Sequence, residues 1–251
     1  MIYFVGAGPG DPDLITVRGR KLLEQADMLI YAGSLVSDEQ LQWCKADCEI
    51  YNSAGMSLEE VEKKFLEAEE KNYLTVRLHS GDPTLYGAIR EQIDFLTSKN
   101  IPYEVIPGVS SFTAAAAVIG KEFTLPDVSQ TIILTRAAGR TPVPEKENLK
   151  SLAEHGASMA IFLSAGQIDT VAKELAAGYG RSDVPCVVIY RATWNEQKII
   201  SATLTDIAEK VKAHGITKQA QILVGDFLGD KYNRSKLYDP EFSHGFRKAS
   251  K

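Results

Sequence analysis

The feature that most constrains the fold is a regular alternation of short apolar runs with segments of helical periodicity along the whole chain. In the first half, this pattern predicts strands at residues 2–6, 28–31, 49–51, 74–78 and 104–106. Helices are expected between them, at residues 14–25, 38–45, 57–71, 84–99 and 110–118. Ser57 and Glu60 form a capping box at the start of the third helix. Such alternation is typical of parallel or mixed sheets covered by helices.

The second half repeats the alternation, with strands expected at residues 131–135, 159–163, 186–190, 199–202 and 221–224. Helices are expected near residues 145–154, 168–177 and 204–214. Between the halves, residues 119–130 contain Gly120 and Pro126 and show no sustained period, which favours a linker. The prediction is an α/β protein of two domains, each a mostly five-stranded mixed sheet flanked by helices. The expected segments are an N-terminal domain at 1–118, the linker at 119–130, a C-terminal domain at 131–230 and a polar tail at 231–251.

Charge and composition limit the class of partner. The 251 residues carry a net charge of −5, which argues against broad electrostatic capture of nucleic acid or anionic membrane. No window approaches the roughly 18 apolar residues of a membrane span, and residues 1–10 carry no basic run. Cys44, Cys48 and Cys186 have no clustered histidine partners, so ordinary thiols and no bound metal are expected. We therefore expect a cytoplasmic protein that acts on a small molecule.

The first glycine-rich segment, residues 6–12, follows a strand and precedes a helix. Its spacing is G-x-G-x-G and not the G-x-G-x-x-G of dinucleotide-binding loops. Pro9 has no N–H to offer a phosphate, and Asp11 and Asp13 would repel a pyrophosphate. The segment therefore predicts a ligand without phosphates, such as S-adenosylmethionine, although a simple tight turn would account for it equally well.

Two further glycine loops follow predicted strands. In residues 79–87, Asp82 either caps a helix that begins at Pro83 or offers a carboxylate to a hydroxyl or ammonium group. In residues 106–112, Gly108 precedes Ser110 and Ser111, which could also be simple helix caps. Three glycine loops at the carboxyl ends of three strands in one domain predict a ligand-binding edge.

The three loops resemble the motifs of the tetrapyrrole (corrin and porphyrin) methylases, and the similarity covers roughly residues 1–230. Residues 31–36, 80–87 and 188–194 are most similar to the branch that methylates precorrin-4 or cobalt-precorrin-4 at C11. The resemblance implies a homodimeric methyltransferase of cobalamin biosynthesis that binds S-adenosylmethionine in a cleft between two domains. It also implies a polycarboxylate tetrapyrrole as substrate.

The resemblance also implies site residues. The expected cofactor contacts are Pro9, Gly81, Asp82, Leu85, Ser110 and Ser111 in the first domain and Leu163, Arg191, Ala192, Ala220 and Gln221 in the second. Ser34, Tyr86 and Arg136 are expected to line the substrate site. The arginines that could anchor carboxylates are Arg18, Arg77, Arg90, Arg136, Arg140 and Arg191, with Arg136 and Arg191 favoured because they end strands. Trp43 and Trp194 are expected in a core or an interface.

One departure from the family pattern leaves the catalytic residues unassigned. Relatives that methylate uroporphyrinogen have an aspartate where this chain has Gly33, and their lysine has no counterpart that can be placed in residues 52–56. No acid–base role can be transferred, and uroporphyrinogen is disfavoured as the substrate.

Other functions stay open. A nicotinamide-dependent oxidoreductase would need an acidic residue near position 30, and Ile30 to Gly33 offer none. A non-catalytic tetrapyrrole- or nucleotide-binding module is disfavoured by the several matching loops. Within the family, another precorrin, diphthine synthesis and ribosomal RNA methylation are alternatives. Precorrin-4 with cobalt and precorrin-4 without cobalt both stay open as substrates.

Overall fold

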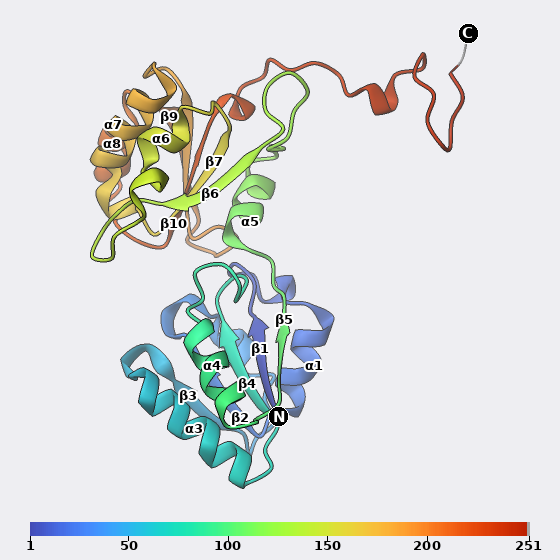
Figure 1. The fold of residues 1–251 in the computed structure, drawn as a ribbon, viewed down its shortest axis with the longest axis vertical. Helices are drawn as coiled ribbons and strands as arrows, with labels where there is room; N and C mark the ends of the chain where they lie inside the picture. Colours follow the sequence, from blue (N-terminus) through green and yellow to red (C-terminus); the bar gives the residue numbers. More distant parts are fainter. Residues whose placement is uncertain (250–251) are drawn as a thin grey trace. The chain divides into compact units, whose positions relative to one another are not determined.

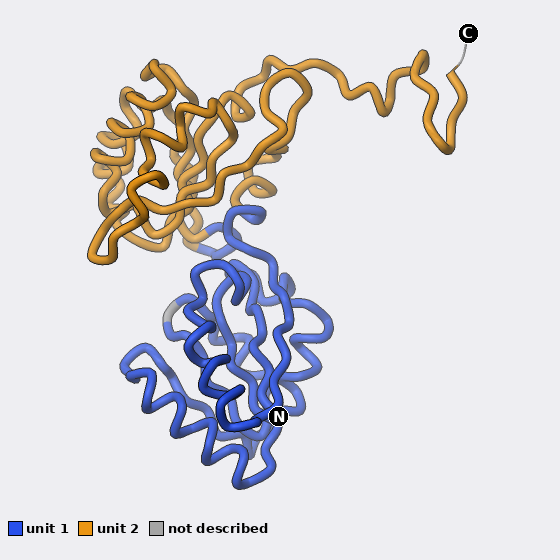
Figure 2. Tube along the Cα trace, in the orientation of Figure 1, with its two compact units in different colours: residues 1–114, 192–195 blue, residues 115–191, 196–251 orange. Residues whose placement is uncertain are grey.

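The computed structural model describes residues 1–249, apart from the side chain of Ser34. The chain divides into two compact units (Figure 2). Unit 1 comprises residues 1–114 and 192–195, and unit 2 comprises residues 115–191 and 196–251. The boundary falls inside helix α5 (Ser111–Val118), ahead of the segment 119–130 that was expected to be a linker. Residues 192–195 come from the second half of the chain yet belong to unit 1.

Unit 1 is built on five parallel strands in the order β3-β2-β4-β1-β5. The strands are β1 (Ile2–Gly6), β2 (Met28–Tyr31), β3 (Glu49–Asn52), β4 (Thr75–His79) and β5 (Tyr103–Ile106). The helices are α1 (Val17–Gln25), the short α2 (Asp38–Leu41), α3 (Leu58–Glu70) and α4 (Arg90–Ser98), followed by α5. One core cluster packs Val5 against Leu23 of α1, and a second packs Phe4 against Phe65 of α3. Helices therefore cover both faces of the sheet, as a parallel sheet requires.

Local signals fix the start of α3 but mislead for α4. Ser57 and Glu60 form the predicted capping box. The helix expected at 84–99 begins only at Arg90, so the interpretation of Asp82 as its cap is wrong. Tyr86 and Ala88 have positive φ angles of 57° and 48°, which an α-helix does not allow. A Cβ on Gly87 would overlap the carbonyl oxygen of Pro83, so residues 83–89 form tight turns.

Unit 2 contains a mixed five-stranded sheet in the order β6-β7-β10-β8-β9. The strands are β6 (Ile132–Arg136), β7 (Ser158–Phe162), β8 (Pro185–Tyr190), β9 (Lys198–Thr203) and β10 (Ala220–Val224). Only the β6–β7 pair is parallel. The helices α6 (Leu149–Ala153), α7 (Ile168–Tyr179) and α8 (Ile207–Ala213) lie together against the sheet (Figure 1). Their apolar residues Leu149, Leu175 and Val211 share one core with Met159 and Val188 of the strands.

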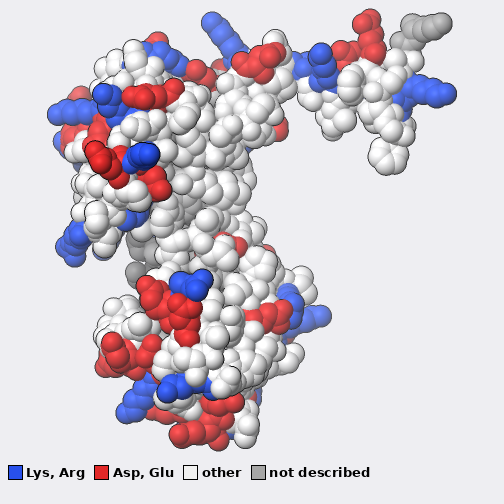
Figure 3. Space-filling view, in the orientation of Figure 1, with Lys and Arg blue, Asp and Glu red and all other residues white. Residues whose placement is uncertain are grey.

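The segments outside the two sheets are tied to unit 2. The Phe123 and Phe227 rings pack with centroids 4.8 Å apart, and Lys121 Nζ donates to the carbonyl oxygen of Gly229 at 2.9 Å. Near the C-terminus, the Arg247 guanidinium donates to the carbonyl oxygens of Leu237 and Asp239 and so holds a set of turns. Acidic and basic side chains are intermixed on the visible face of each unit (Figure 3). None of the helices in residues 1–249 is long and apolar enough to cross a membrane.

Candidate functional site

The three glycine loops of unit 1 meet at one edge of its sheet, as predicted. Strands β4, β1 and β5 are adjacent and parallel, so the loops that follow them emerge side by side. Gly8 and Gly81 bond to each other in both directions, with N···O distances of 3.2 and 2.7 Å. The Ala7 N–H donates to the carbonyl oxygen of His79 at 2.7 Å. We call residues 6–13, 79–88 and 106–111 the unit 1 edge.

Glycine is required at this edge because the loop backbones touch one another. A Cβ on Gly6 would lie 2.6 Å from the Cα of Gly108 and 2.6 Å from the carbonyl oxygen of Gly81. A Cβ on Gly108 would overlap the same carbonyl oxygen. The glycines therefore serve loop-to-loop packing, which any side chain would prevent.

Asp82 joins the second loop to the third. One carboxylate oxygen accepts the Thr84 N–H at 2.8 Å, and the other accepts the Gly108 N–H at 2.9 Å. The carboxylate thus does accept a hydroxyl, but it is that of Thr84 in its own loop. A contact between Asp82 and a ligand stays a prediction, and what the structure provides is a carboxylate that fixes two loops.

The backbone donors of the first loop are largely occupied within the protein. Ala7 and Gly8 donate to the second loop, Asp11 N–H donates to Thr193 Oγ1 at 3.0 Å, and Asp13 N–H donates to Asp11 Oδ1 at 2.9 Å. Pro9 has no N–H. A phosphate-binding loop needs several free N–H groups that converge on the ligand. This loop does not offer that cradle, so its geometry agrees with a ligand that lacks phosphates.

Trp194 closes the first loop from outside. Its indole Nε1–H donates to the carbonyl oxygen of Pro9 at 2.8 Å. A Cβ on Gly10 would overlap the indole ring, so Gly10 makes room for Trp194. Trp194 was expected in a core or an interface, and the residues around it in the sequence carry no sign of this contact.

The structure brings the expected unit 1 site residues together. The three loops contain Pro9, Gly81, Asp82, Leu85, Ser110 and Ser111. Ser110 is buried, Ser111 is the first residue of α5, and Tyr86 is 46% exposed in the second loop. Ala192, expected in the second domain, belongs to unit 1 and is buried. The side chain of Ser34 lies outside the described part of the structure.

A buried basic pair lies on β4, just before the second loop. His79 is 4% exposed, and its Nε2 has no hydrogen-bond partner within residues 1–249. Burial, and next the charge of Arg77, lower the pKa of His79 to about 3. Arg77 is also buried and donates to Gln92 Oε1 at 3.2 Å and to the Ile30 carbonyl oxygen at 3.3 Å. Arg77 therefore supports the sheet and is not an anchor for substrate carboxylates.

The expected second-domain residues also share one edge. Strands β6 and β7 are parallel and β10 is antiparallel to β7 and β8, so the carboxyl ends of β6, β7 and β8 lie beside the amino end of β10. This unit 2 edge comprises Arg136, Leu163, Arg191, Gln219, Ala220 and Gln221.

The backbone of the unit 2 edge is strained. Leu163, Arg191 and Gln219 have positive φ angles of 53°, 47° and 57°. This conformation costs a non-glycine residue about 1–2 kcal/mol. Leu163 is nevertheless 73% exposed, so its own packing in the chain does not explain the strain. Strained residues with displayed side chains are typical of functional sites.

The polar side chains of this edge have partners within unit 2. Arg191 donates to Gln219 Oε1 at 3.0 Å and to Glu196 Oε1 at 3.2 Å. The Arg136 guanidinium donates to the carbonyl oxygens of Ala137, Thr141 and Pro142 and so holds the loop after β6. Gln221 is buried and donates to the carbonyl oxygen of Ile161 at 3.1 Å. Contacts of these residues with ligands stay predictions.

Comparison with known proteins shows which family has this architecture. Residues 1–208 match the family model of the Tetrapyrrole (Corrin/Porphyrin) Methylases. The chain belongs to this family. The methylase is 54% identical to a cobalt-precorrin-4 C(11)-methyltransferase from Methanocaldococcus jannaschii, with 100% of this chain and 97% of the relative covered. It is 48% identical to the enzyme of the same name from Priestia megaterium, with 100% and 98% covered.

Solved structures agree with the methylase fold. The X-ray structure of a cobalt precorrin-4 methyltransferase, a cobalamin biosynthetic enzyme, matches with a TM-score of 0.89 at 47% identity, covering 91% of this chain and 96% of the other. A uroporphyrin III C-methyl transferase from Thermus thermophilus matches with a TM-score of 0.75 at 26% identity, covering 90% and 92%. The predicted α/β class with two five-stranded sheets flanked by helices is therefore confirmed, but only the unit 2 sheet is mixed, because every strand pair of the unit 1 sheet is parallel.

The described part of the methylase contains neither a recognisable metal cluster nor a disulfide. Within residues 1–249, no group of three or more His, Cys, Asp or Glu side chains is arranged to hold a metal ion. Cys44, Cys48 and Cys186 are free thiols, and burial raises the pKa of Cys186.

Proposed function

We propose that this methylase transfers a methyl group from S-adenosylmethionine to C11 of cobalt-precorrin-4 in cobalamin biosynthesis. The observation that carries the proposal is identity of 54% and 48%, over the whole chain, with two enzymes that bear this name. Methylation of precorrin-4 without cobalt, or of another precorrin, is the nearest alternative.

The chemistry of the unit 1 edge supports the proposed cofactor. Pro9 and the occupied donors of the first loop disfavour a pyrophosphate, which S-adenosylmethionine does not have. A uroporphyrin-III C-methyl transferase of the same fold from Thermus thermophilus was solved in complex with S-adenosylhomocysteine. The residues proposed to hold the cofactor are Pro9, Gly81, Asp82, Leu85, Ser110, Ser111, Leu163, Arg191, Ala192, Ala220 and Gln221.

The protein's own contribution is proposed to be alignment and exclusion of water. The sulfonium of S-adenosylmethionine supplies a methyl group that is already activated, and its product is a neutral thioether. Rigid loops that hold two reactants in line can then account for much of the rate. The hydrogen bonds of Asp82 and Trp194 give the first and second loops that rigidity. No residue is assigned as a general acid or base.

Arg136, Tyr86 and Ser34 stay the proposed substrate contacts, with Arg191 as a further anchor for carboxylates. The Arg191–Glu196 ion pair is partly exposed, so a substrate carboxylate could replace Glu196 at small cost.

We also propose that the methylase is a cytoplasmic homodimer. The C-terminal segment supports association, because it exposes Tyr232, Leu237, Tyr238, Phe242 and Phe246. Exposed apolar side chains gathered in one segment are typical of interaction surfaces. Light scattering of the full chain is expected to give twice the monomer mass of 27.5 kDa, and a monomer at micromolar concentration would contradict the dimer.

Calorimetry tests the cofactor class. Titration with S-adenosylhomocysteine is expected to release heat with one site per chain, and NADH is expected to release none. Heat with NADH and none with the thioether would instead favour an oxidoreductase.

A further inference from the structure

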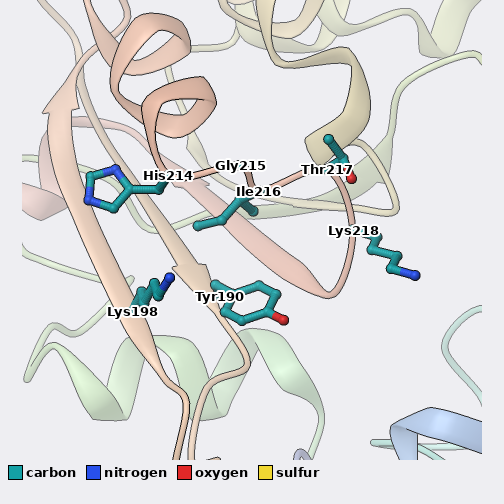
Figure 4. Close-up of a pocket in the computed structure, with 7 residues that line it drawn as sticks. All are labelled: Tyr190, Lys198, His214, Gly215, Ile216, Thr217 and Lys218. Atoms are coloured by element: carbon teal, nitrogen blue, oxygen red, sulfur yellow. The ribbon is translucent and has the colours of Figure 1, made fainter.

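Unit 2 contains a small recess, and none of the residues that line it is among the proposed cofactor or substrate residues. It lies between the strands β8 and β9 and the loop that joins α8 to β10 (Figure 4). Tyr190 and Lys198 line the strand side, and residues 214–218 line the loop side. Its volume is about 150 Å³, smaller than the roughly 300 Å³ at which whole-ligand pockets begin. The recess therefore suits one arm of a ligand and not a complete macrocycle.

The lining of the recess is basic. Lys198, His214 and Lys218 line it together with Tyr190 and Thr217, and no acidic residue is among the lining residues. His214 Nδ1 lies 2.8 Å from the carbonyl oxygen of Lys210, which can only accept, so Nδ1 carries the hydrogen.

The two recess lysines differ from their neighbours on α8. Lys210 pairs with Asp206 at 2.7 Å, and Lys212 pairs with Asp169 at 2.6 Å. Lys198 and Lys218 form no ion pair with a carboxylate anywhere in residues 1–249. Two lysines that line one hollow and lack a carboxylate partner favour the binding of an anion there.

The recess adjoins the unit 2 edge. Tyr190 is the last residue of β8 and is paired in register with Ala220 of β10 and Lys198 of β9. The next residue is Arg191, whose guanidinium lies 5.7 Å from the centre of the Tyr190 ring. A ligand held at this edge could therefore extend a side arm past Tyr190 into the recess.

We infer that this recess binds a carboxylate arm of the polycarboxylate tetrapyrrole and so helps to select and orient the substrate. The inference rests on the proposed function for the identity of the ligand. Lys198 and Lys218 supply the charge, and Tyr190 and Thr217 supply neutral hydrogen bonds. The same chemistry would suit free inorganic phosphate, so the experiment separates the two sources.

The test compares two double variants with the same change in charge. Lys198→Gln with Lys218→Gln removes the recess charges, and Lys210→Gln with Lys212→Gln removes two paired lysines of α8. Loss of two charge-assisted hydrogen bonds at an exposed site is expected to raise KM for cobalt-precorrin-4 roughly tenfold in the first variant. The control variant is expected to stay within about twofold, and in both variants kcat and the Kd for S-adenosylhomocysteine are expected to change less than about twofold.

A binding experiment tests the recess without relying on methyl transfer by the protein. Uroporphyrin I carries eight carboxylates and quenches protein fluorescence, so its Kd can be measured even if the chain does not methylate cobalt-precorrin-4. A roughly tenfold weaker Kd in the recess variant alone supports the inference. Equal KM and Kd values for the two double variants would overturn it. Saturable binding of inorganic phosphate that shifts the His214 NMR signals, with an unchanged uroporphyrin Kd, would also overturn it.

Discussion

The edge of unit 1 joins its three loops through glycine backbone, with the left-handed Tyr86 and Ala88 confined to the second loop, whereas every left-handed residue at the edge of unit 2 keeps a side chain. In unit 1, Gly6 and Gly108 allow three loops to touch through backbone atoms. In unit 2, Leu163, Arg191 and Gln219 adopt positive φ angles that glycine would adopt without strain. The first edge thus gains rigidity from close backbone packing. The second edge displays large side chains at some expense of stability, which suits residues that contact a ligand.

The largest expected effect comes from disturbing the glycine packing. Gly108→Ala places a Cβ against the carbonyl oxygen of Gly81 and near the backbone of Gly6, which neither loop can avoid without separating. We expect a loss of about 3 kcal/mol or more in the free energy of unfolding, measured with urea. We also expect binding of S-adenosylhomocysteine to be abolished.

Gly55→Ala is the matched control for this glycine. Nothing lies within 4 Å of a Cβ at Gly55, so its free energy of unfolding is expected to change by less than about 0.5 kcal/mol. If Gly108→Ala were as stable as Gly55→Ala, loop-to-loop packing would not explain the glycines of unit 1.

The next largest effect is expected from acid, because the buried His79 of unit 1 lies directly before the second loop of the unit 1 edge. His79 is neutral when folded, with a pKa of about 3, but takes up a proton near pH 6.5 when unfolded. Its contribution to stability is therefore complete above pH 6.5 and is lost as the pH falls below that value, by about 2 kcal/mol at pH 5. The buried Gln221 of the unit 2 edge does not titrate, so this acid sensitivity belongs to unit 1.

Hydrogen exchange measures this difference unit by unit. Between pH 7 and pH 5, amides of β1 and β4 are expected to lose more protection in the wild type than in His79→Leu, while β7 and β10 respond alike in both proteins. His155→Leu, a change at an exposed histidine, serves as the control. An identical acid response of β1 and β4 in wild type and His79→Leu would contradict the assigned role of His79.

The smallest effect is expected from relieving strain in unit 2. Leu163→Gly removes the energetic cost of holding an exposed leucine in the left-handed backbone conformation. We expect the free energy of unfolding to rise by about 1 kcal/mol and the binding of S-adenosylhomocysteine to weaken. Val17→Gly is the control, because Val17 is equally exposed, at 73%, but lies in helix α1, where glycine is destabilising. Destabilisation by Leu163→Gly, with cofactor binding unchanged, would remove the distinction between the two edges.

The same comparison explains what the sequence could and could not predict. The unit 1 edge was predicted correctly because glycine marks tight loops and buried parallel strands are continuous apolar runs. The late start of α4 was missed because Tyr86 and Ala88 carry no local sign of a left-handed backbone. The sequence around Leu163 and Arg191 of unit 2 likewise gives no local sign of their left-handed backbone conformation. The contact of Trp194 with Pro9 joins residues 185 positions apart, and no local pattern encodes it.

The central claim is tested most directly by the product of the reaction. The protein is incubated with cobalt-precorrin-4 and S-adenosylmethionine carrying a ¹³C-labelled methyl group, and the tetrapyrrole is analysed by mass spectrometry and NMR. We predict a mass increase of one labelled methyl group and a new methyl signal correlated with C11. Unchanged cobalt-precorrin-4, together with methylation of a different precorrin offered in parallel, would contradict the C11 assignment.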